Sequence, residues 1–354
     1  MGDRHAPPIS ERLDDEHWVW FGRATHESLR IVQSLFSDEG ENRDYELLEW
    51  QYLGRRHGSY VAIAHGDAGL ESSASALYAA LPSTVFRGGR TVSAVQSYDS
   101  ITAKQARGKG LFSRLGKYTY EKLKSEDISL VYGIPNDNIN SARQKQLGWR
   151  SLDPLPMFIR PIGLRYPRVK IGIRRPRKLS LPVTRDKLVS RIESCPPDLR
   201  DLFFRSDLRG RVGVMRDSEF MSWRMRRPGA DYVWFESRDA SGLLTGFSGC
   251  ELQIKHGCAT GYVMDVIFDR GLPHIADSHI DAMVEHLRKC GADVILAWSI
   301  ESSQAAEALK RHGFFYFWER ARPTHLHLGY RFLDSEASLR RSDLSFSYLD
   351  SDTV

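Results

Sequence analysis

The two halves of the chain resemble each other, and this repeat constrains the fold more than any other feature of the sequence. Leu47–Tyr52 (LLEWQY) precedes RRHGSYVAIA, and Phe220–Met225 (FMSWRM) precedes RRPGADYVWFE, with a tryptophan at the same place in each. Further on, residues 131–149 (VYGIPNDNINSARQKQLGW) correspond to residues 295–315 (ILAWSIESSQAAEALKRHGFF). A repeat of this length indicates a duplicated domain rather than a solenoid, whose period is far shorter.

Length and composition agree with two globular domains. The chain has 354 residues, of which 41% are hydrophobic and 27% charged, and a domain takes roughly 150 residues. No apolar run is long enough to cross a bilayer, and the polar N-terminus does not resemble a secretory signal. The four cysteines have no CxxC spacing. We therefore expect a reduced, cytoplasmic protein without a metal site.

The hydrophobic periodicity predicts an α+β arrangement in each half. In the first half we expect helices over residues 25–36 and 110–124 and from about 140, and strands over 59–64, 71–79, 91–101 and 128–134. In the second half we expect strands over residues 232–237, 245–253, 262–268 and 294–298, a long helix around 280–287 and a shorter one over 302–312. The order is antiparallel at first and then βαβ-like.

One segment of the first half carries specific chemistry, namely the turn Gln105-Ala-Arg-Gly-Lys-Gly110 between a strand and a helix. Gly108 and Gly110 let the backbone approach a ligand, and the amides of the helix start then point at an anion. Arg107 and Lys109 add positive charge. These features predict a diphosphate at the helix N-terminus. The segment is neither a P-loop nor the dinucleotide fingerprint, because GxxxxGK[ST] and GxGxxG are both absent.

These residues resemble the GCN5-related N-acetyltransferase (GNAT) superfamily. The likeness rests on Q-x-x-G-x-G after a strand, an Asn-rich turn before a helix, and Leu147-Gly148-Trp149, and it is strongest over residues 90–150. The stretch IPNDNINS is also similar to family members found with polysaccharide and amino-sugar genes. The resemblance implies two GNAT-like domains in tandem, each a mixed, mostly antiparallel sheet flanked by helices. It also implies acetyl-CoA or another short acyl-CoA as co-substrate.

By the same resemblance, one set of residues is expected to bind the coenzyme. These are Ser100, Ile101, Thr102, Gln105, Arg107, Gly108, Lys109, Gly110, Leu111 and Asn138. The first three would pair through their backbone with the pantetheine arm, as a peptide adds to a sheet edge.

The implied chemistry is direct transfer of an acyl group from a thioester to an amine, which needs a base for the substrate ammonium. Asp99 is the first candidate, with Ser97 and Tyr98 as its neighbours; the alternative is that Asp99 only accepts hydrogen bonds at a strand end. The tyrosine that often protonates the leaving thiolate in this family is missing, and Arg143-Gln-Lys145-Gln occupies that turn.

The second half departs from the family at the coenzyme loop. Asp269-Arg-Gly-Leu-Pro273-His contains no Q-x-x-G-x-G, so we expect this copy not to bind coenzyme A. Asp265, Trp298 and Glu301 are expected to contact the acceptor instead. Core packing for Trp298 and helix capping for Glu301 remain as alternatives.

The resulting domain plan has five parts. We expect a disordered tail over residues 1–14, an acyl-CoA-binding domain over 15–160, a basic, Pro-rich linker over 161–180, a degenerate copy over 181–333 and a disordered tail over 334–354.

Three functions fit the sequence. The favoured one is an acyl-CoA-dependent N-acyltransferase acting on a small amine, with a nucleotide-linked amino sugar as the preferred acceptor, by direct transfer in a ternary complex. The second is an aminoacyl-tRNA-dependent transferase of tandem GNAT fold, and the third is a non-catalytic acyl-CoA-sensing module. The net charge of +5 is mild, so for the favoured function we expect no specific nucleic acid and no membrane partner. The chain would be a monomer or homodimer.

Overall fold

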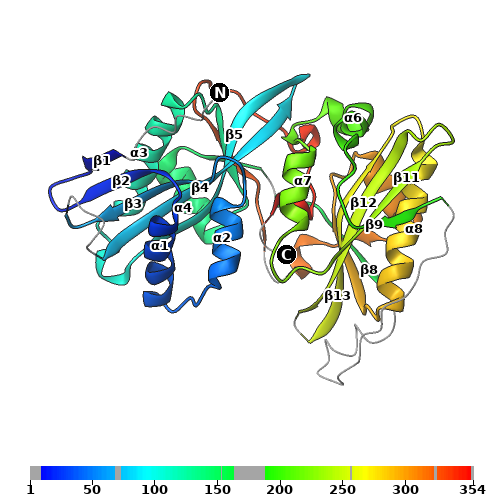
Figure 1. The fold of residues 1–354 in the computed structure, drawn as a ribbon, viewed down its shortest axis with the longest axis horizontal. Coiled ribbons are helices and arrows are strands. Elements are labelled where there is room, and N and C mark those ends of the chain that lie inside the picture. Colours follow the sequence, from blue (N-terminus) through cyan, green and yellow to red (C-terminus); the bar gives the residue numbers. More distant parts are fainter. Residues whose placement is uncertain are drawn as a thin grey trace. The chain divides into compact units, whose positions relative to one another are not determined.

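The computed structural model describes residues 9–67, 73–152, 154–162, 188–255, 257–322 and 325–351. The chain forms two compact units, each built around its own sheet (Figure 1). Unit 1 comprises Met1–Val85, Thr91–Leu152 and Leu326–Ser338, and unit 2 comprises Phe86–Arg90, Asp153–His325 and Leu339–Val354. The linker expected over 161–180 lies, from residue 163 on, outside the described residues.

The sheet of unit 1 has the strand order β1-β2-β3-β4-β5-β6-β16-β7. The strands are β1 (Ile9–Arg12), β2 (Trp18–Arg23), β3 (Tyr60–His65), β4 (Ala74–Arg87), β5 (Arg90–Thr102), β6 (Leu130–Gly133), β7 (Arg150–Ser151) and β16 (Gly329–Phe332). Strands β5 and β6 run parallel, whereas β16 is antiparallel to both of its neighbours.

Four helices accompany this sheet: α1 (His26–Asp38), α2 (Tyr45–Leu53), α3 (Leu111–Ser125) and α4 (Asp137–Leu147). Helix α1 begins at a capping box formed by Thr25 and Ser28, and α1 and α2 lie side by side (Figure 1). Helix α3 confirms the helix expected over 110–124 to within one residue at each end, whereas α4 begins about three residues earlier than expected.

The sheet of unit 2 has the order β15-β8-β14-β13-β12-β11-β9. Its strands are β8 (Met157–Pro161), β9 (Ser190–Ile192), β11 (Tyr232–Arg238), β12 (Leu244–Lys255), β13 (Cys258–Phe268), β14 (Val294–Trp298) and β15 (Phe315–Tyr316). The helices are α6 (Leu199–Arg205), α7 (Ser218–Met225), α8 (Pro273–Lys289) and α9 (Gln304–Arg311); β10 (Gly213–Val214) is a further short strand. Helix α8 packs on β12 and β13 and contacts α9.

Short 3-10 turns complete the secondary structure. They are η1 (Lys104–Ala106), η2 (Asp207–Gly210), η3 (Glu319–Ala321), η4 (Arg341–Asp343) and η5 (Tyr348–Asp350). The strand expected in the second half over 294–298 is β14 without change, and the α+β class expected for both halves is confirmed.

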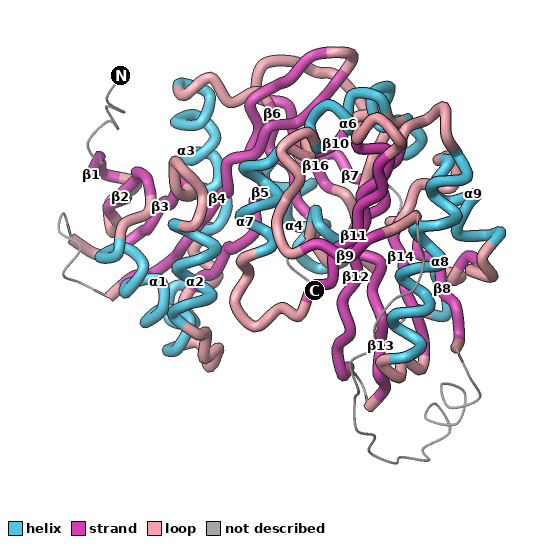
Figure 2. Tube along the Cα trace, turned by 45° about the vertical axis from the view of Figure 1, so that its right-hand side comes forward, coloured by secondary structure: helices cyan, strands magenta, loops and turns pink. Residues whose placement is uncertain are grey.

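Each sheet contains a strand that the sequence order would assign to the other. Strand β8 lies at the end of the first expected domain (15–160), yet it pairs with β14 and β15 in unit 2 (Figure 2). Strand β16 lies at the end of the second expected domain (181–333), yet it pairs with β6 and β7 in unit 1. The boundaries expected at residues 160 and 333 therefore differ from those of the structure, because strands pair through non-local hydrogen bonds that periodicity does not encode.

The expected disorder is wrong for much of both tails. Strand β1 pairs with β2 from Ile9 to Arg12. At the other end, Leu344, Tyr348 and Leu349 are each only 2% exposed. The serines and aspartates between them make local caps instead of loosening the chain, since the Ser347 side chain accepts a hydrogen bond from the amide of Leu349.

Candidate functional site

The glycine loop predicted to hold a diphosphate joins β5 to α3. Gly108 has a φ of +80° and Gly110 a φ of +75°, and Gly110 is the N-cap of α3 with no side-chain cap. A Cβ added at Gly108 would meet no atom within 4 Å, so this position is open to a ligand. Because the first amides of a helix lack intrahelical acceptors, the loop presents a positively polarised backbone surface.

The basic side chains of the loop are held by carboxylates. Arg107 donates to Glu39, and the Lys109 Nζ lies 3.0 Å from the Glu16 carboxylate. Glu39, whose side chain is only 5% exposed, also accepts the amide of Lys104 at 2.8 Å. It therefore fastens the loop to the end of α1. Arg107 and Lys109 are each about half exposed, so an incoming phosphate can reach both.

Strands β5 and β6 part just before this loop. They pair at only three positions, ending with Gln96 opposite Tyr132. Strand β6 stops at Gly133, whereas β5 continues to Thr102. At about 3.3 Å per residue, β5 thus extends about 20 Å past its last pairing with β6. Ser100, Ile101 and Thr102 are half-buried on this stretch, to which β6 does not pair. We call this part of β5, from Ser97 to Thr102 with no β6 residue paired to it, the opening of unit 1; along the chain it leads to Gly108 and Gly110.

The remaining residues expected to bind coenzyme A are placed in different ways. Gln105 is exposed in the turn before the loop. The Leu111 side chain is buried in the core of unit 1, so only its backbone can face a ligand. The Asn138 side chain lies outside the described residues; its neighbour Asn136 caps α4 by accepting the amide of Ile139.

Asp99 is buried in a hydrogen-bonded cluster. Both of its carboxylate oxygens lie 3.0 Å from Arg43 Nη1, and the Tyr52 hydroxyl donates to one of them at 2.8 Å. Tyr98 packs edge-on against Tyr52, with ring centroids 5.2 Å apart. Burial raises the pKa of both tyrosines well above the ordinary value. Arg43 and Tyr52 were not predicted by the sequence, because both lie about 50 residues before Asp99.

Ser97 has a different partner, Arg143 of α4, whose Nη2 donates to the Ser97 Oγ at 2.9 Å. A Cβ on Gly133 would lie 3.0 Å from Arg143 Nη1 and 2.7 Å from the carbonyl oxygen of Ser97. Glycine at the end of β6 therefore makes room for the guanidinium. Sequence reasoning named Arg143 only as occupying its helix turn, and Gly133 was the signal that a neighbour approaches closely here.

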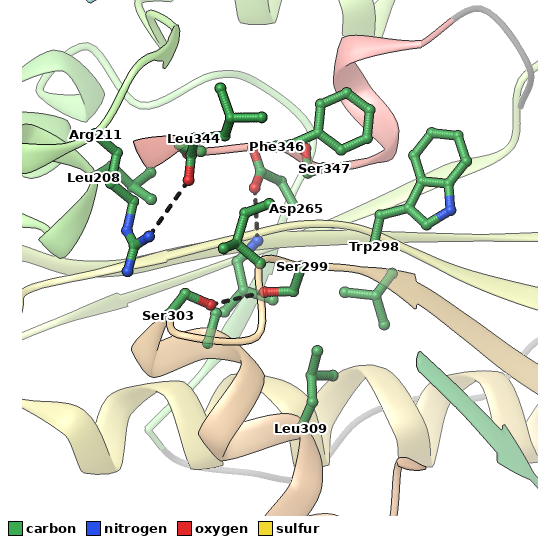
Figure 3. Close-up of a pocket in the computed structure, with 15 residues that line it drawn as sticks. Leu208, Arg211, Asp265, Trp298, Ser299, Ser303, Leu309, Leu344, Phe346 and Ser347 are labelled. Atoms are coloured by element: carbon green, nitrogen blue, oxygen red, sulfur yellow. Dashed lines mark hydrogen bonds between the residues drawn. The ribbon is translucent and has the colours of Figure 1, made fainter. Parts of the chain in front are cut away.

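Unit 2 has a matching opening between parallel strands. The pairing of β13 with β14 ends at Val263 opposite Ala297, whereas β13 continues to Phe268. Asp265 and Trp298 line a pocket at this place, together with Ser299, Ser303 and residues of the C-terminal segment (Figure 3).

The C-terminal segment of the chain fills this second opening. Trp298 stacks on Tyr348, and Asp265 is bridged to Asp350 by Arg216, at 2.7 Å and 2.8 Å. The cavity that remains has a volume of about 40 Å³, which holds water but not a coenzyme arm. Burial raises the pKa of Asp265, although the Arg216 cation acts in the opposite direction.

The third residue expected to bind the acceptor, Glu301, pairs with Arg341 at 3.1 Å. All three therefore contact the chain itself, and their acceptor role remains a prediction.

Within the described ranges, no group of three or more His, Cys, Asp or Glu residues is placed to hold a metal ion. None of the helices in this part of the chain is both long and apolar enough to span a membrane.

Comparison with solved structures identifies the fold. A protein of unknown function from Enterococcus faecalis, described as a probable N-acyltransferase, superposes with a TM-score of 0.62 at 11% identity, over 89% of this chain and 73% of that one. A GCN5-related N-acetyltransferase from Anabaena variabilis gives 0.62 at 13% identity, over 89% and 73%. The N-myristoyltransferase of Saccharomyces cerevisiae with bound myristoyl-CoA gives 0.60 at 14%, over 99% and 92%.

The chain thus has the fold of the GCN5-related N-acetyltransferases, with a sheet of this kind in each unit. Neither a protein-family model nor a curated protein matches the sequence.

Proposed function

We propose that the protein is an acyl-CoA-dependent N-acyltransferase that uses the opening of unit 1. The observation that carries this proposal is that the stretch of β5 to which β6 does not pair is followed directly by the glycine loop at the start of α3. Such an arrangement suits a ligand with an extended amide-containing arm and a diphosphate. Unit 2 has the opening without the loop, and its own C-terminal segment fills it.

The backbone carries most of the proposed coenzyme contacts. The amides from Gly108 to Leu111 would hold the pyrophosphate, and Arg107 and Lys109 would exchange their carboxylate partners for phosphate oxygens. The backbone from Ser100 to Thr102 would pair with the pantetheine arm. Both reactants would then meet in one cleft, which supplies much of the rate of direct transfer.

For the acceptor, we propose a small amine and place nucleotide-linked amino sugars first. This choice is supported by the basic stretch after residue 160 and by the likeness of IPNDNINS to proteins found with amino-sugar genes. Asp99 as the general base also remains a prediction. Its hydrogen bonds to Arg43 and Tyr52 support the alternative, in which Asp99 serves as a hydrogen-bond acceptor that holds the cluster together.

The test is calorimetric binding of acetyl-CoA, followed by transfer assays with a panel of amino sugars, nucleotide-linked amino sugars, peptides and aminoacyl-tRNA. We expect one equivalent of acetyl-CoA to bind per chain, and we expect Gly108→Asp and Gly110→Asp to abolish this binding. Gly108→Ala introduces the backbone strain without the charge, and Gly242→Asp introduces an aspartate at another open glycine of positive φ in unit 2. Both controls should bind.

Two equivalents per chain, or normal binding by both aspartate variants of the loop, would contradict the assignment. Binding without transfer to any amine would favour a sensing module, and transfer from aminoacyl-tRNA alone would favour the tRNA-dependent enzyme.

A further inference from the structure

Arg143 is a buried cation with no anion beside it among the residues that the structure describes. It is 3% exposed, and the hydrogen bond that its side chain makes within these residues goes to the neutral hydroxyl of Ser97. The Nε atom is buried and has no hydrogen-bond partner. No carboxylate of the described chain lies within ion-pair distance of it. A guanidinium in this state is costly, because buried charges are normally paired and fully hydrogen-bonded.

The neighbours of Arg143 compensate its charge only in part. The guanidinium lies over the Trp149 ring, 4.6 Å from the ring centre, and such a contact stabilises a buried cation less than a paired carboxylate does. Trp149 in turn donates to the Tyr120 hydroxyl at 2.6 Å, so its own hydrogen bond brings no carboxylate near Arg143. By contrast, Arg216 in unit 2 is just as buried but pairs with both Asp265 and Asp350.

Arg143 also lies where the two strands part. Its partner Ser97 is the first residue of β5 beyond the last pair, Gln96 and Tyr132. Gly133, which makes room for the guanidinium, directly follows Tyr132 on β6. The cation therefore contacts Ser97, at the end of the opening where β5 and β6 are still paired. The glycine loop follows the other end, after Thr102. A coenzyme bound with its pyrophosphate at the loop and its arm along β5 brings its sulfur toward Arg143.

We propose that Arg143 is a catalytic residue that stabilises the thiolate of the departing coenzyme; this rests on the function proposed above. In the reaction the amine nitrogen forms a bond to the thioester carbon, and the carbon–sulfur bond breaks with its electron pair on sulfur. The amine proton passes to a base or to water. Arg143 transfers no proton, because a guanidinium stays protonated in proteins. It supplies a fixed positive charge in a site shielded from water, where such a charge acts strongly.

The first test measures the thiol of bound coenzyme A, which requires no knowledge of the acceptor. The fraction of thiolate is followed by ultraviolet absorbance as a function of pH, with wild type and Arg143→Met saturated with coenzyme A. We expect the thiol to titrate about one to three pH units lower in wild type than in Arg143→Met, the range expected for one nearby charge. Lys145→Met removes an exposed cation from the same helix and should titrate as wild type does.

The second test measures turnover once an acceptor is known. We expect Arg143→Met to lower kcat about 100- to 1000-fold, as the loss of one fixed stabilising donor does. Acyl thioesters of less basic thiols should reduce that defect, because their thiolates need less stabilisation. Arg143→Gln also removes the charge, so it serves if Arg143→Met does not fold. Arg143→Lys keeps the charge and should retain most of the thiol shift.

The outcomes separate this proposal from the function on which it rests. Failure of wild type to bind coenzyme A would overturn both. Normal binding with the same thiol titration in wild type and in the variants that lack the charge of residue 143 would overturn the role of Arg143 alone. A kcat defect that is the same for all leaving thiols would also overturn it.

Discussion

Trp298 and Tyr348 lie face to face in unit 2, with ring centroids 4.0 Å apart and ring planes 16° apart. Trp298 ends β14, and Tyr348 begins the last turn of the C-terminal segment. Phe346 extends the stack from the same segment, with a centroid 5.2 Å from that of Trp298. In unit 2, therefore, side chains of the C-terminal segment occupy the opening between the parallel strands. The corresponding opening of unit 1 leads to the glycine loop.

Removal of the Tyr348 ring should destabilise unit 2. Tyr348 is 2% exposed, and we expect Tyr348→Ala to lower the free energy of unfolding by about 3 kcal/mol, as for other large buried aromatic side chains. Urea unfolding followed by tryptophan fluorescence measures this. Trp318→Ala, at a residue 75% exposed in the same unit, should change the stability by less than about 0.5 kcal/mol. Equal effects of the two variants would show that the stack does not hold the segment.

The stability of unit 2 should fall in mild acid because of His279. This residue is fully buried between Ser248, at 2.7 Å, and Ser237, at 3.0 Å, and burial lowers the pKa of His279 to about 3. The unfolded chain binds the proton near pH 6.5, so the stabilising contribution is complete above that pH and is lost as the pH falls from 6.5 toward 3. The loss amounts to about 2 kcal/mol by pH 5.

The measurement is unfolding of wild type and His279→Gln between pH 7 and pH 5. Because the substitution itself changes the stability at pH 7, the quantity to compare is the slope of the free energy of unfolding with pH. We expect a shallower slope in His279→Gln. Parallel slopes would show that another group is responsible for the acid sensitivity.

Neutralisation of Glu16 should strengthen coenzyme binding. Glu16 pairs with Lys109 of the glycine loop, and the hydrogen bond from Lys109 lowers the pKa of Glu16. Because this exposed carboxylate competes with phosphate for Lys109, we expect Glu16→Gln to bind acetyl-CoA about two-fold more tightly at low salt. The gain should shrink at high salt.

Calorimetry at two salt concentrations measures the effect. Glu27→Gln removes a negative charge from an exposed position of the same unit that pairs with no cation of the described chain, and it should bind as wild type does. Weaker binding by Glu16→Gln would indicate that Glu16 positions the loop instead of competing for it.

Substitution of Asp99 should separate a structural role from that of a base. Asp99→Asn removes the buried carboxylate that pairs with Arg43 and leaves it only the more exposed Glu41, at 3.5 Å; we expect a loss of about 3 kcal/mol, the lower end for a broken buried pair because Arg43 is partly exposed. Tyr52→Phe removes one hydrogen bond to Asp99 and should cost about 1.5 kcal/mol. From these bonds we expect the folded Asp99→Asn enzyme to keep its kcat within about ten-fold; loss of a base would typically cost more. A larger fall in kcat, with loss of the acidic limb of its pH profile, would instead establish Asp99 as the base.

Much of the local structure follows from the sequence by itself. The helix over 110–124, the strand over 294–298 and the turn at Gly108 and Gly110 were all predictable. Their signals are local: a 3.6-residue apolar period, an apolar run of strand length, and glycine where the backbone needs a positive φ. The repeated order of these elements was likewise sufficient to predict a duplicated α+β domain.

The tertiary structure decided which segments meet. Strand β8 pairs in the sheet of unit 2 and β16 in the sheet of unit 1, each away from its neighbours in the sequence. The C-terminal segment fills the opening of unit 2, and Arg143 donates a hydrogen bond to Ser97, 46 residues away in the chain. None of these contacts has a local signature, because backbone pairing and side-chain burial depend on partners that are distant in the chain. The residues after 333 illustrate this: their low apolar content predicted disorder, yet Tyr348 and Leu349 are buried, and Tyr348 stacks on Trp298 from about 50 residues earlier in the chain.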